Sequence, residues 1–312
     1  MLYDTCMNEN MIYDAVIVGG GPAGLSAALT LGRARKRVLL CDSGPRRNAA
    51  AVHMHNFISR DGTPPEDLRR IARQQLEAYP NVEIDDALVE EIGGEAGAFT
   101  VRLSTRSLAA RRILLCTGML DELPDLEGVK QLWGASIFIC PYCHAWEVQD
   151  RRFAYLVASA DKLGFAMLLR SWTSDVTVLT DGKVVIPPEL RAQFSAAGVR
   201  VEERPVARLI AGGDGLERID FTDGDSLLCE ILFMHPPQRQ VAIVESMGLA
   251  LDAMGYVEVN AMRETSRRGV YAAGDLTSPV QSAVLSAAAG MQTAANLNLA
   301  LTVELATAGA LA

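Results

Sequence analysis

Two cysteines and a histidine stand together in the stretch Phe138–Trp146, which reads FICPYCHAW. Cys140 and Cys143 have the C-x-x-C spacing, which suits a metal site, buried structural thiols or a redox dithiol. A structural zinc ion usually takes four ligands, and the chain has no second C-x-x-C and no H-x-x-x-H. The intervening Pro141 and the adjacent His144 argue against inert thiols. We therefore predict a redox-active Cys140–Cys143 pair and no bound metal.

His144 follows the second cysteine directly. An imidazole with a pKa near ~6.5 can take a proton from an incoming thiol, so a base at this position favours oxidation of a dithiol substrate. A local hydrogen-bonding role for His144 is the alternative. Glu147, three residues on, can orient the imidazole, and an acid from elsewhere in the fold would serve equally.

A glycine-rich turn, GGGPAG at Gly19–Gly24, lies between the apolar runs Tyr13–Val18 and Arg37–Cys41. In G-x-G-x-x-G, the first glycine permits a tight bend, the second lets the backbone approach a pyrophosphate, and the third lets helix and strand pack closely. The N–H groups that open the following helix favour the anion. Asp42, which ends the second run, suits a ribose hydroxyl and would repel a 2'-phosphate. The predicted dinucleotide ligands are Gly19, Gly21, Pro22, Ala23, Gly24 and Asp42; a plain strand-to-helix turn is the alternative.

The elements that must position these residues follow from apolar periodicity and turn signals. A strand, the glycine turn, a helix over 25–33 and a second strand make a βαβ unit, and a similar unit follows the cysteine pair. The further elements expected are a helix over 64–78 with Leu68, Ile71, Ala72 and Gln75 on one face, strands over 99–103, 112–116, 153–158 and 175–179, a helix over about 162–172, a strand within 265–275, and a long packed helix from about 281.

The length of 312 residues suggests about two domains. We infer an α/β protein with a discontinuous first domain, residues 1–119 and 236–312, and a second domain inserted at 120–235. The net charge of −9 argues against nucleic acid as the main partner. We expect no membrane span and no secretory signal, and the scattered cysteines favour a reducing cytoplasm.

These motifs together resemble the low-molecular-weight thioredoxin-reductase family of flavoproteins over almost the whole chain. The resemblance rests on GGGPAG at Gly19–Gly24, on AAGD at Ala272–Asp275 and on the helix from Gln281 to Met291. It implies FAD as cofactor, two Rossmann-like domains of three layers (ββα) and a homodimer. The flavin-binding residues that it implies are Asn56, Cys116, Thr117, Gly118, Gly274, Asp275, Gln281 and Ser282.

The second nucleotide fingerprint of that family is degenerate in this chain. Where the family has G-x-G-x-x-A for NADPH, residues 157–162 read VASADK, and side chains at Val157 and Ser159 would crowd the turn. The arginines that take the 2'-phosphate are replaced by residues 180–183, TDGK. A diverged site that still binds NADPH is the alternative. We predict that pyridine nucleotide is not the physiological partner.

CPYCH with a degenerate NADPH loop resembles the dithiol-oxidase branch of the family, which closes disulfides in natural products such as gliotoxin, holomycin and romidepsin. Within this branch we expect the chain to resemble the romidepsin-type bacterial enzyme. The resemblance implies that Cys140 exchanges with a small-molecule dithiol, that Cys143 lies nearest the flavin, and that molecular oxygen takes the electrons. Two alternatives stay open. One is an NAD(P)H- or ferredoxin-dependent disulfide reductase, and the other is a flavin redox sensor without catalytic turnover.

Overall fold

The computed structural model describes residues 12–44, 46–213 and 215–310; Cys6 lies outside them. The chain forms two compact units. Unit 1 comprises residues 1–47, 66–120 and 239–312, and unit 2 comprises residues 48–65 and 121–238. In this division the segment 48–65 belongs to unit 2. The predicted domain bounds, 1–119 with 236–312 and 120–235, stay a prediction. Two short paired strands, β7 (Leu120–Asp121) and β16 (Gln238–Arg239), carry the chain from one unit to the other.

Unit 1 is built on a seven-stranded sheet with the order β3-β2-β1-β6-β5-β4, in which β17 also pairs with β6. The strands β3, β2, β1, β6 and β17 pair in parallel, and β4, β5 and β6 form an antiparallel meander. Its elements are β1 (Tyr13–Val18), α1 (Pro22–Arg33), β2 (Val38–Cys41), α2 (Pro65–Leu76), β3 (Val82–Asp85), β4 (Val89–Glu95), β5 (Ala98–Leu103), β6 (Ser107–Leu115), α7 (Ala242–Ser246), β17 (Val270–Ala272), the 3₁₀ helix η2 (Asp275–Thr277) and α8 (Ala283–Thr307).

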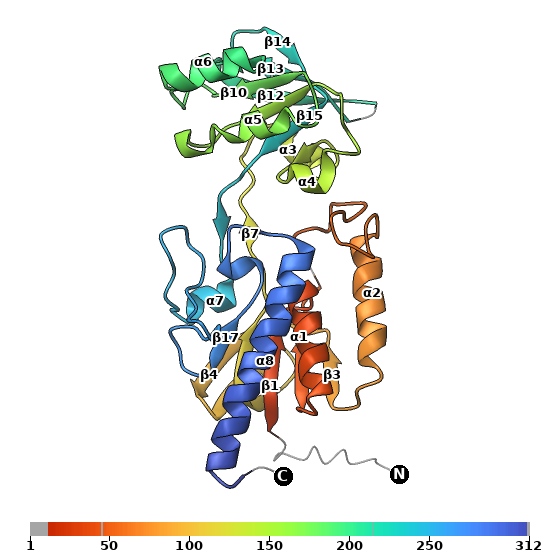
Figure 1. Cartoon of the computed structure of the whole chain (residues 1–312), viewed down its shortest axis with the longest axis vertical. Coiled ribbons are helices and arrows are strands. Elements are labelled where there is room, and N and C mark those ends of the chain that lie inside the picture. The colour runs from red at the N-terminus through yellow and green to blue at the C-terminus, as the bar shows by residue number, and fades with distance from the viewer. Residues whose placement is uncertain (1–11, 45, 214, 311–312) are drawn as a thin grey trace. The chain divides into compact units, whose positions relative to one another are not determined.

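Both faces of this sheet are buried, and strand β1 shows how. Ala15 and Ile17 belong to the core beneath helices α1 and α8, while Val16 and Val18 belong to the core on the opposite face. Burial on both faces explains why β1 reads as a nearly continuous apolar run. Helices α1 and α8 lie side by side (Figure 1). A Cβ on Gly290 of α8 would come within 2.0 Å of the Ala23 carbonyl oxygen, so this glycine allows the two helices to approach closely.

Unit 2 holds a five-stranded parallel sheet with the order β11-β10-β9-β15-β8 and a three-stranded antiparallel sheet, β12-β13-β14. The parallel sheet has the same strand, helix and strand arrangement as unit 1, which makes unit 2 the second Rossmann-like unit. Its elements are α3 (Val129–Leu132), β8 (Ile137–Phe138), α4 (Pro141–His144), β9 (Phe153–Leu156), the 3₁₀ helix η1 (Ala160–Lys162), α5 (Phe165–Leu169), β10 (Val176–Leu179), α6 (Pro188–Ala196), β11 (Val199–Glu202), β12 (Val206–Gly212), β13 (Gly215–Phe221), β14 (Ser226–Leu228) and β15 (Ile231–Met234).

The predicted helix over 162–172 is wrong in length. The structure has the 3₁₀ helix η1 and then the five-residue α-helix α5, and backbone hydrogen bonds at their ends run from residue i to residue i−3, as from Leu163 to Ala160 and from Ala166 to Leu163. The side chains of Leu163, Ala166 and Leu169 are buried. On α2 the predicted face is wrong at Gln75, which is exposed, whereas Leu76 is buried.

The strands predicted at 13–18, 37–41, 99–103 and 175–179 are present, with shifts of at most one residue at their ends. The expected long C-terminal helix is α8. Within the described residues, no helix is both long and apolar enough to span a membrane.

Candidate functional site

The glycine turn in unit 1 joins β1 to α1, and packing dictates two of its three fingerprint glycines. Gly19 has φ +112°, and a Cβ there would lie 2.3 Å from the Cys116 carbonyl oxygen. A Cβ on Gly24 would lie 1.8 Å from the Gly19 carbonyl oxygen. A Cβ on Gly21, the N-cap of α1, would meet nothing within 4 Å. The fold itself therefore requires Gly19 and Gly24, and the open space at Gly21 is what a closely approaching pyrophosphate needs.

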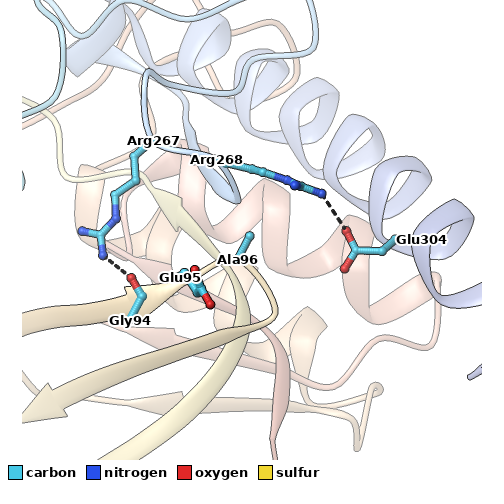
Figure 2. Close-up of a pocket in the computed structure, with 6 residues that line it drawn as sticks. All are labelled: Gly94, Glu95, Ala96, Arg267, Arg268 and Glu304. Carbon is cyan, nitrogen blue, oxygen red and sulfur yellow. Dashed lines mark hydrogen bonds and ion pairs between the residues drawn. The ribbon is translucent and has the colours of Figure 1, made fainter. Parts of the chain in front are cut away.

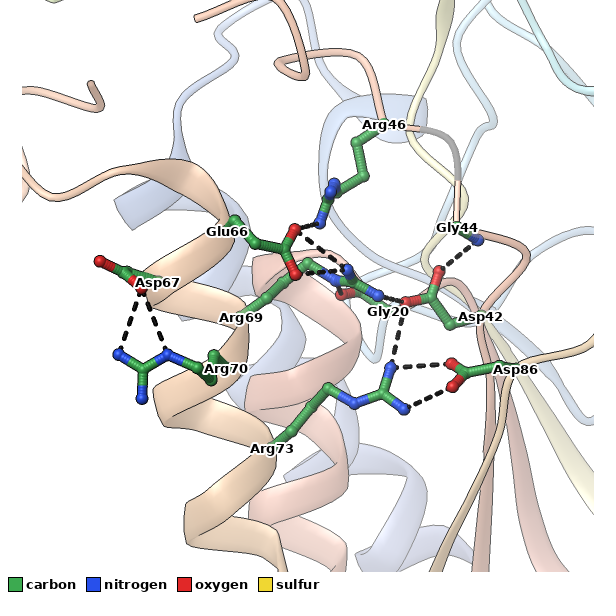
Figure 3. Close-up of polar contacts among 10 residues, drawn as sticks. All are labelled: Gly20, Asp42, Gly44, Arg46, Glu66, Asp67, Arg69, Arg70, Arg73 and Asp86. Carbon is green, nitrogen blue, oxygen red and sulfur yellow. Dashed lines mark hydrogen bonds and ion pairs between the residues drawn. The ribbon is translucent and has the colours of Figure 1, made fainter. Parts of the chain in front are cut away.

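Asp42 lies at the C-terminal end of β2, as predicted, and is only 6% exposed. Its Oδ1 accepts a hydrogen bond of 3.1 Å from the Gly44 N–H. Its Oδ2 pairs with Arg69 and lies 3.7 Å from Nη1 of Arg73, both on helix α2 (Figure 3). Sequence reasoning missed these two arginines, although their i, i+4 spacing on the predicted helix 64–78 is a readable signal.

The hollow beside Asp42 has a volume of about 530 Å³ and is lined by four side chains from α2 that carry charge, Glu66, Arg69, Arg70 and Arg73. Arg46 pairs with Glu66 at 2.5 Å, and its buried Nε has no hydrogen-bond partner among the described residues. The unpartnered Arg46 Nε lies near the first turn of helix α2, close to the guanidinium groups of that helix. A buried donor in such a place fits an anionic dinucleotide.

The C-terminal motif lies against the same turn. Gly274 has φ +92°, and a Cβ there would lie 3.1 Å from the Ala23 side chain. Asp275, which opens η2, accepts hydrogen bonds from Ser286 Oγ at 2.8 Å and from Arg47 Nη1 at 3.3 Å. These contacts gather Gly19, Gly24, Asp42, Cys116 and Asp275 in unit 1, although they lie far apart in the sequence.

The remaining predicted flavin contacts have structural roles of their own in this region. Gln281 Nε2 donates a hydrogen bond of 3.3 Å to the Asp275 carbonyl oxygen, and its Oε1 accepts one from Arg47. Ser282 is the N-cap of α8 and accepts from the Leu285 N–H. Thr117 and Gly118 follow buried Cys116 at the end of β6, and Gly118 has φ +67°. Arg47 and Ser286 are contacts of Asp275 that sequence reasoning missed.

Asn56, the last of the predicted flavin contacts, belongs to unit 2. It is exposed, adopts φ +61°, and belongs to the segment 48–65 of unit 2. Its N–H donates to Asp61 Oδ1 at 2.8 Å, and an isolated bridge between Met54 and Thr63 closes this short turn. The predicted flavin contact of Asn56 stays a prediction.

Cys140 and Cys143 form a disulfide across the start of helix α4. Cys140 is the N-cap and Pro141 is the first helical residue, where a missing N–H costs nothing. Among the described residues, the free thiols are Cys41, Cys116 and Cys229, and all three are buried. Burial raises the pKa of Cys41 and of Cys229 to about 12, and it raises the pKa of Cys116 as well. Thiols with raised pKa values are poor nucleophiles at neutral pH, so thiol chemistry is concentrated at the Cys140–Cys143 pair.

His144, the last residue of α4, stacks on Phe138 with ring centroids 4.5 Å apart. Burial lowers its pKa below 6.5; the charge of Glu147 opposes this, and that of His55 adds to it. The carboxylate of Glu147 lies 3.4 Å from Nε2 of His55, a histidine that sequence reasoning did not connect with the cysteines. The lowered pKa favours the neutral imidazole of His144, which is the form that accepts a proton.

The loop after β9 is occupied by its own side chains. Val157 is buried, and Asp161 accepts a hydrogen bond from the Ser159 side chain, which lowers the pKa of Asp161. After β10, Lys183 pairs with Asp181 at 2.6 Å, and Asp181 also accepts from the Val206 N–H at 2.7 Å. Lys183, the one basic residue of this loop, therefore forms an ion pair with Asp181 of the same loop.

A smaller hollow in unit 1, of about 370 Å³, lies away from all predicted site residues (Figure 2). Its side chains contact protein groups: Arg267 donates to the Gly94 carbonyl oxygen at 2.6 Å, and Arg268 lies 3.8 Å from Glu304. Across the described ranges, no group of three or more His, Cys, Asp or Glu side chains is placed to hold a metal ion.

Two Rossmann-like units, one with a glycine cradle and one with a C-x-x-C disulfide, define a dinucleotide-dependent disulfide oxidoreductase. The chain belongs to the pyridine nucleotide-disulphide oxidoreductase family, which it matches over residues 13–295. Members of this family and their thioredoxin reductase neighbours are FAD-binding flavoproteins, so the predicted cofactor, FAD, is confirmed. The site residues that fit it are those gathered in unit 1.

Relatives and solved structures agree with this assignment. The chain is 30% identical to "Thioredoxin reductase sirT" of Leptosphaeria maculans, with 92% of this chain and 94% of the relative covered. It is 32% identical to "Thioredoxin reductase tcpT" of Claviceps purpurea, with 86% and 88% covered. Among solved structures, an oxidoreductase from Agrobacterium tumefaciens superposes with a TM-score of 0.89 at 35% identity, covering 94% and 99%, and HlmI does so with 0.86 at 35%, covering 96% and 95%. The predicted thioredoxin reductase fold is confirmed.

Proposed function

We propose that this protein is an FAD-dependent dithiol oxidase that closes an intramolecular disulfide in a small-molecule dithiol without using NADP(H). The observation that carries the proposal is the position of His144 directly after the Cys140–Cys143 disulfide, where burial lowers its pKa and so favours the neutral base that can deprotonate an incoming thiol. The crowded and self-paired loops after β9 and β10 support the independence from NADP(H).

The reaction follows from thiol–disulfide exchange. His144 takes a proton from one substrate thiol, and the thiolate attacks Cys140, releasing Cys143 as a thiolate. The second substrate thiolate attacks the substrate sulfur of this mixed disulfide, which releases the cyclic disulfide and leaves both cysteines reduced. Reduction of the disulfide leaves two electrons on the cysteine sulfurs. When bound, FAD would accept these two electrons and pass them to molecular oxygen.

Aromatic side chains around the disulfide favour an apolar small molecule as substrate. Tyr142 and Trp146 are exposed, at 60% and 69%, and Tyr142 packs edge-on against Trp172 at 5.3 Å. Phe138, by contrast, is buried in the core. Exposed aromatic rings beside a reactive group offer apolar contact area to a ligand. A homodimer and a cytoplasmic location stay predictions.

The test is an anaerobic visible spectrum of the FAD-loaded protein, titrated separately with NADPH and with 1,4-dithiothreitol before air is admitted. Bleaching of the flavin by the dithiol alone, reversed by air with formation of hydrogen peroxide, is the expected result. Rapid bleaching by NADPH would contradict the proposal.

A disulfide reductase is the second candidate, because the curated relatives above are named thioredoxin reductases. Steady consumption of NADPH or reduced ferredoxin with a disulfide acceptor would establish it. A flavin redox sensor is distinguished from both enzymes by turnover, since a sensor would oxidise one dithiol per protein and stop.

A further inference from the structure

His55 lies between two carboxylates. Its Nε2 is 3.4 Å from Glu147 Oε1 and its Nδ1 is 3.5 Å from Asp61 Oδ1, and its side chain is 19% exposed. Glu147 follows helix α4, three residues after His144, and Asp61 lies in the same turn as His55. We call His55, Asp61, His144 and Glu147 the two-histidine cluster; all four belong to unit 2.

The members of this cluster interact through their charges. Glu147 stabilises the protonated form of His144, and a protonated His55 opposes it. With both imidazoles neutral the cluster carries a charge of −2, and with both protonated it is neutral. Two carboxylates can therefore balance two protons held on two imidazoles, whereas a lone buried imidazolium would be costly.

Dithiol closure releases two protons. When a dithiol R(SH)₂ reduces the Cys140–Cys143 disulfide, the S–S bond of the protein breaks and one S–S bond forms in the product. The two electrons remain on the two cysteine sulfurs as thiolates, and both thiol protons leave the substrate. His144 has one basic nitrogen available and can hold only one of them.

We propose that His55 accepts one of the two protons and His144 the other, so that the two-histidine cluster stores both until the cysteines are reoxidised. The proposal rests on the dithiol-oxidase function above and adds a second proton acceptor to it. Formation of the mixed disulfide needs only the first deprotonation, and closure needs the second. Removal of His55 should therefore slow closure selectively.

Rapid acid quench under anaerobic conditions separates the two steps. The FAD-loaded protein is mixed with 2-mercaptoethanol, which stops at the mixed disulfide, or with 1,4-dithiothreitol, which goes on to close. Mass spectrometry of the quenched protein counts added probe molecules and free cysteines, and so measures each step without using the flavin. The variants are His55→Gln and Asp61→Asn, with His53→Gln as the matched control on the same exposed turn.

At pH 7 we expect His55→Gln to form the mixed disulfide at the wild-type rate but to close about 10²-fold more slowly, at the lower end of the usual range for a lost base. The mixed disulfide with dithiothreitol should then accumulate. Near pH 9 this deficit should shrink, because a thiol with a pKa of about 8.5 then ionises by itself. The titratable groups that face His55 are His53, Asp61, Glu147 and His144. His53→Gln should match the wild type.

Asp61→Asn keeps the Oδ1 atom that accepts the Asn56 N–H but removes one balancing charge, so it should slow the same step by a smaller factor. It also carries the test should His55→Gln fail to fold. Closure at the wild-type rate in both variants would overturn the inference, and so would equal, pH-independent slowing of both steps. Failure of the wild-type protein to oxidise dithiothreitol would instead defeat the proposed function itself.

Discussion

His144 and His235 are both half-buried imidazoles, yet only His144 stands beside the disulfide. For His144, a lowered pKa keeps the base neutral to more acid pH than an ordinary histidine. We expect dithiol oxidation to fall only when the pH drops below 6.5, through this lowered pKa. His144→Gln should slow oxidation by about 10²-fold and remove that acid limb. Stopped-flow rates from pH 5 to 8 measure both effects, and an unchanged rate would make His144 a structural residue.

The two cysteines of the disulfide are expected to be essential for turnover and dispensable for the cofactor. Cys140→Ser and Cys143→Ser should each abolish dithiol oxidation, since neither can form the Cys140–Cys143 disulfide. Both should retain FAD, because the glycine cradle lies in unit 1 and the pair lies in unit 2. Cys229→Ser, a buried thiol of unit 2, is the matched control and should turn over normally. Turnover by either active-site variant would refute the exchange scheme.

At the scale of the β1–turn–α1 element, Gly24 is required by packing of the fold, whereas Gly21 is required only for close approach of the cofactor. A Cβ on Gly24 collides with the Gly19 carbonyl oxygen, whereas a Cβ on Gly21 meets open space. Gly24→Ala should therefore unfold more easily in urea and lose FAD together with stability. Gly21→Ala should keep wild-type stability but bind FAD at least about tenfold more weakly, or roughly 1.4 kcal/mol. Equal FAD affinity for Gly21→Ala and the wild type would show that no pyrophosphate approaches this turn closely.

At the scale of the whole molecule, acid is expected to weaken unit 2 through His235. Burial lowers the pKa of His235 to about 4, and its Nδ1 lies 3.3 Å from the Tyr155 hydroxyl. The unfolded chain binds a proton at this group near pH 6.5 and the folded chain near pH 4, so stability falls as the pH drops between these values. The loss at pH 5 is on the order of 2 kcal/mol.

Tryptophan fluorescence measures this loss in unit 2 by itself, because all three tryptophans, Trp133, Trp146 and Trp172, lie there. Urea unfolding at pH 7 and pH 5 should show a larger decrease for the wild type than for His235→Gln. The same decrease in both proteins would assign the acid sensitivity to other groups.

Local patterns predicted the parts of the fold that depend on neighbours in the sequence. The run Tyr13–Val18, the glycine turn and Asp42 all lie within thirty residues of one another, and turn geometry and strand burial explain them without any distant contact. The segment 162–172 was predicted as one long helix because its apolar spacing does not mark where a helix ends, whereas the structure divides it between the 3₁₀ helix η1 and the α-helix α5. The antiparallel sheet β12-β13-β14 was not predicted at all, since its pairing depends on register between strands.

The sequence alone determined the chemistry of this protein: a C-x-x-C pair followed by histidine, a glycine cradle with an acid after the next strand, and a second cradle without its glycines. Residue types and short spacings suffice for these features, because they express steric and acid–base requirements of single turns. Only the tertiary structure brought Arg69 and Arg73 to Asp42, Arg47 to Asp275, and His55 to Glu147. Such contacts join elements far apart in the chain, and only the packing of helices and loops on the sheets decides which side chains meet.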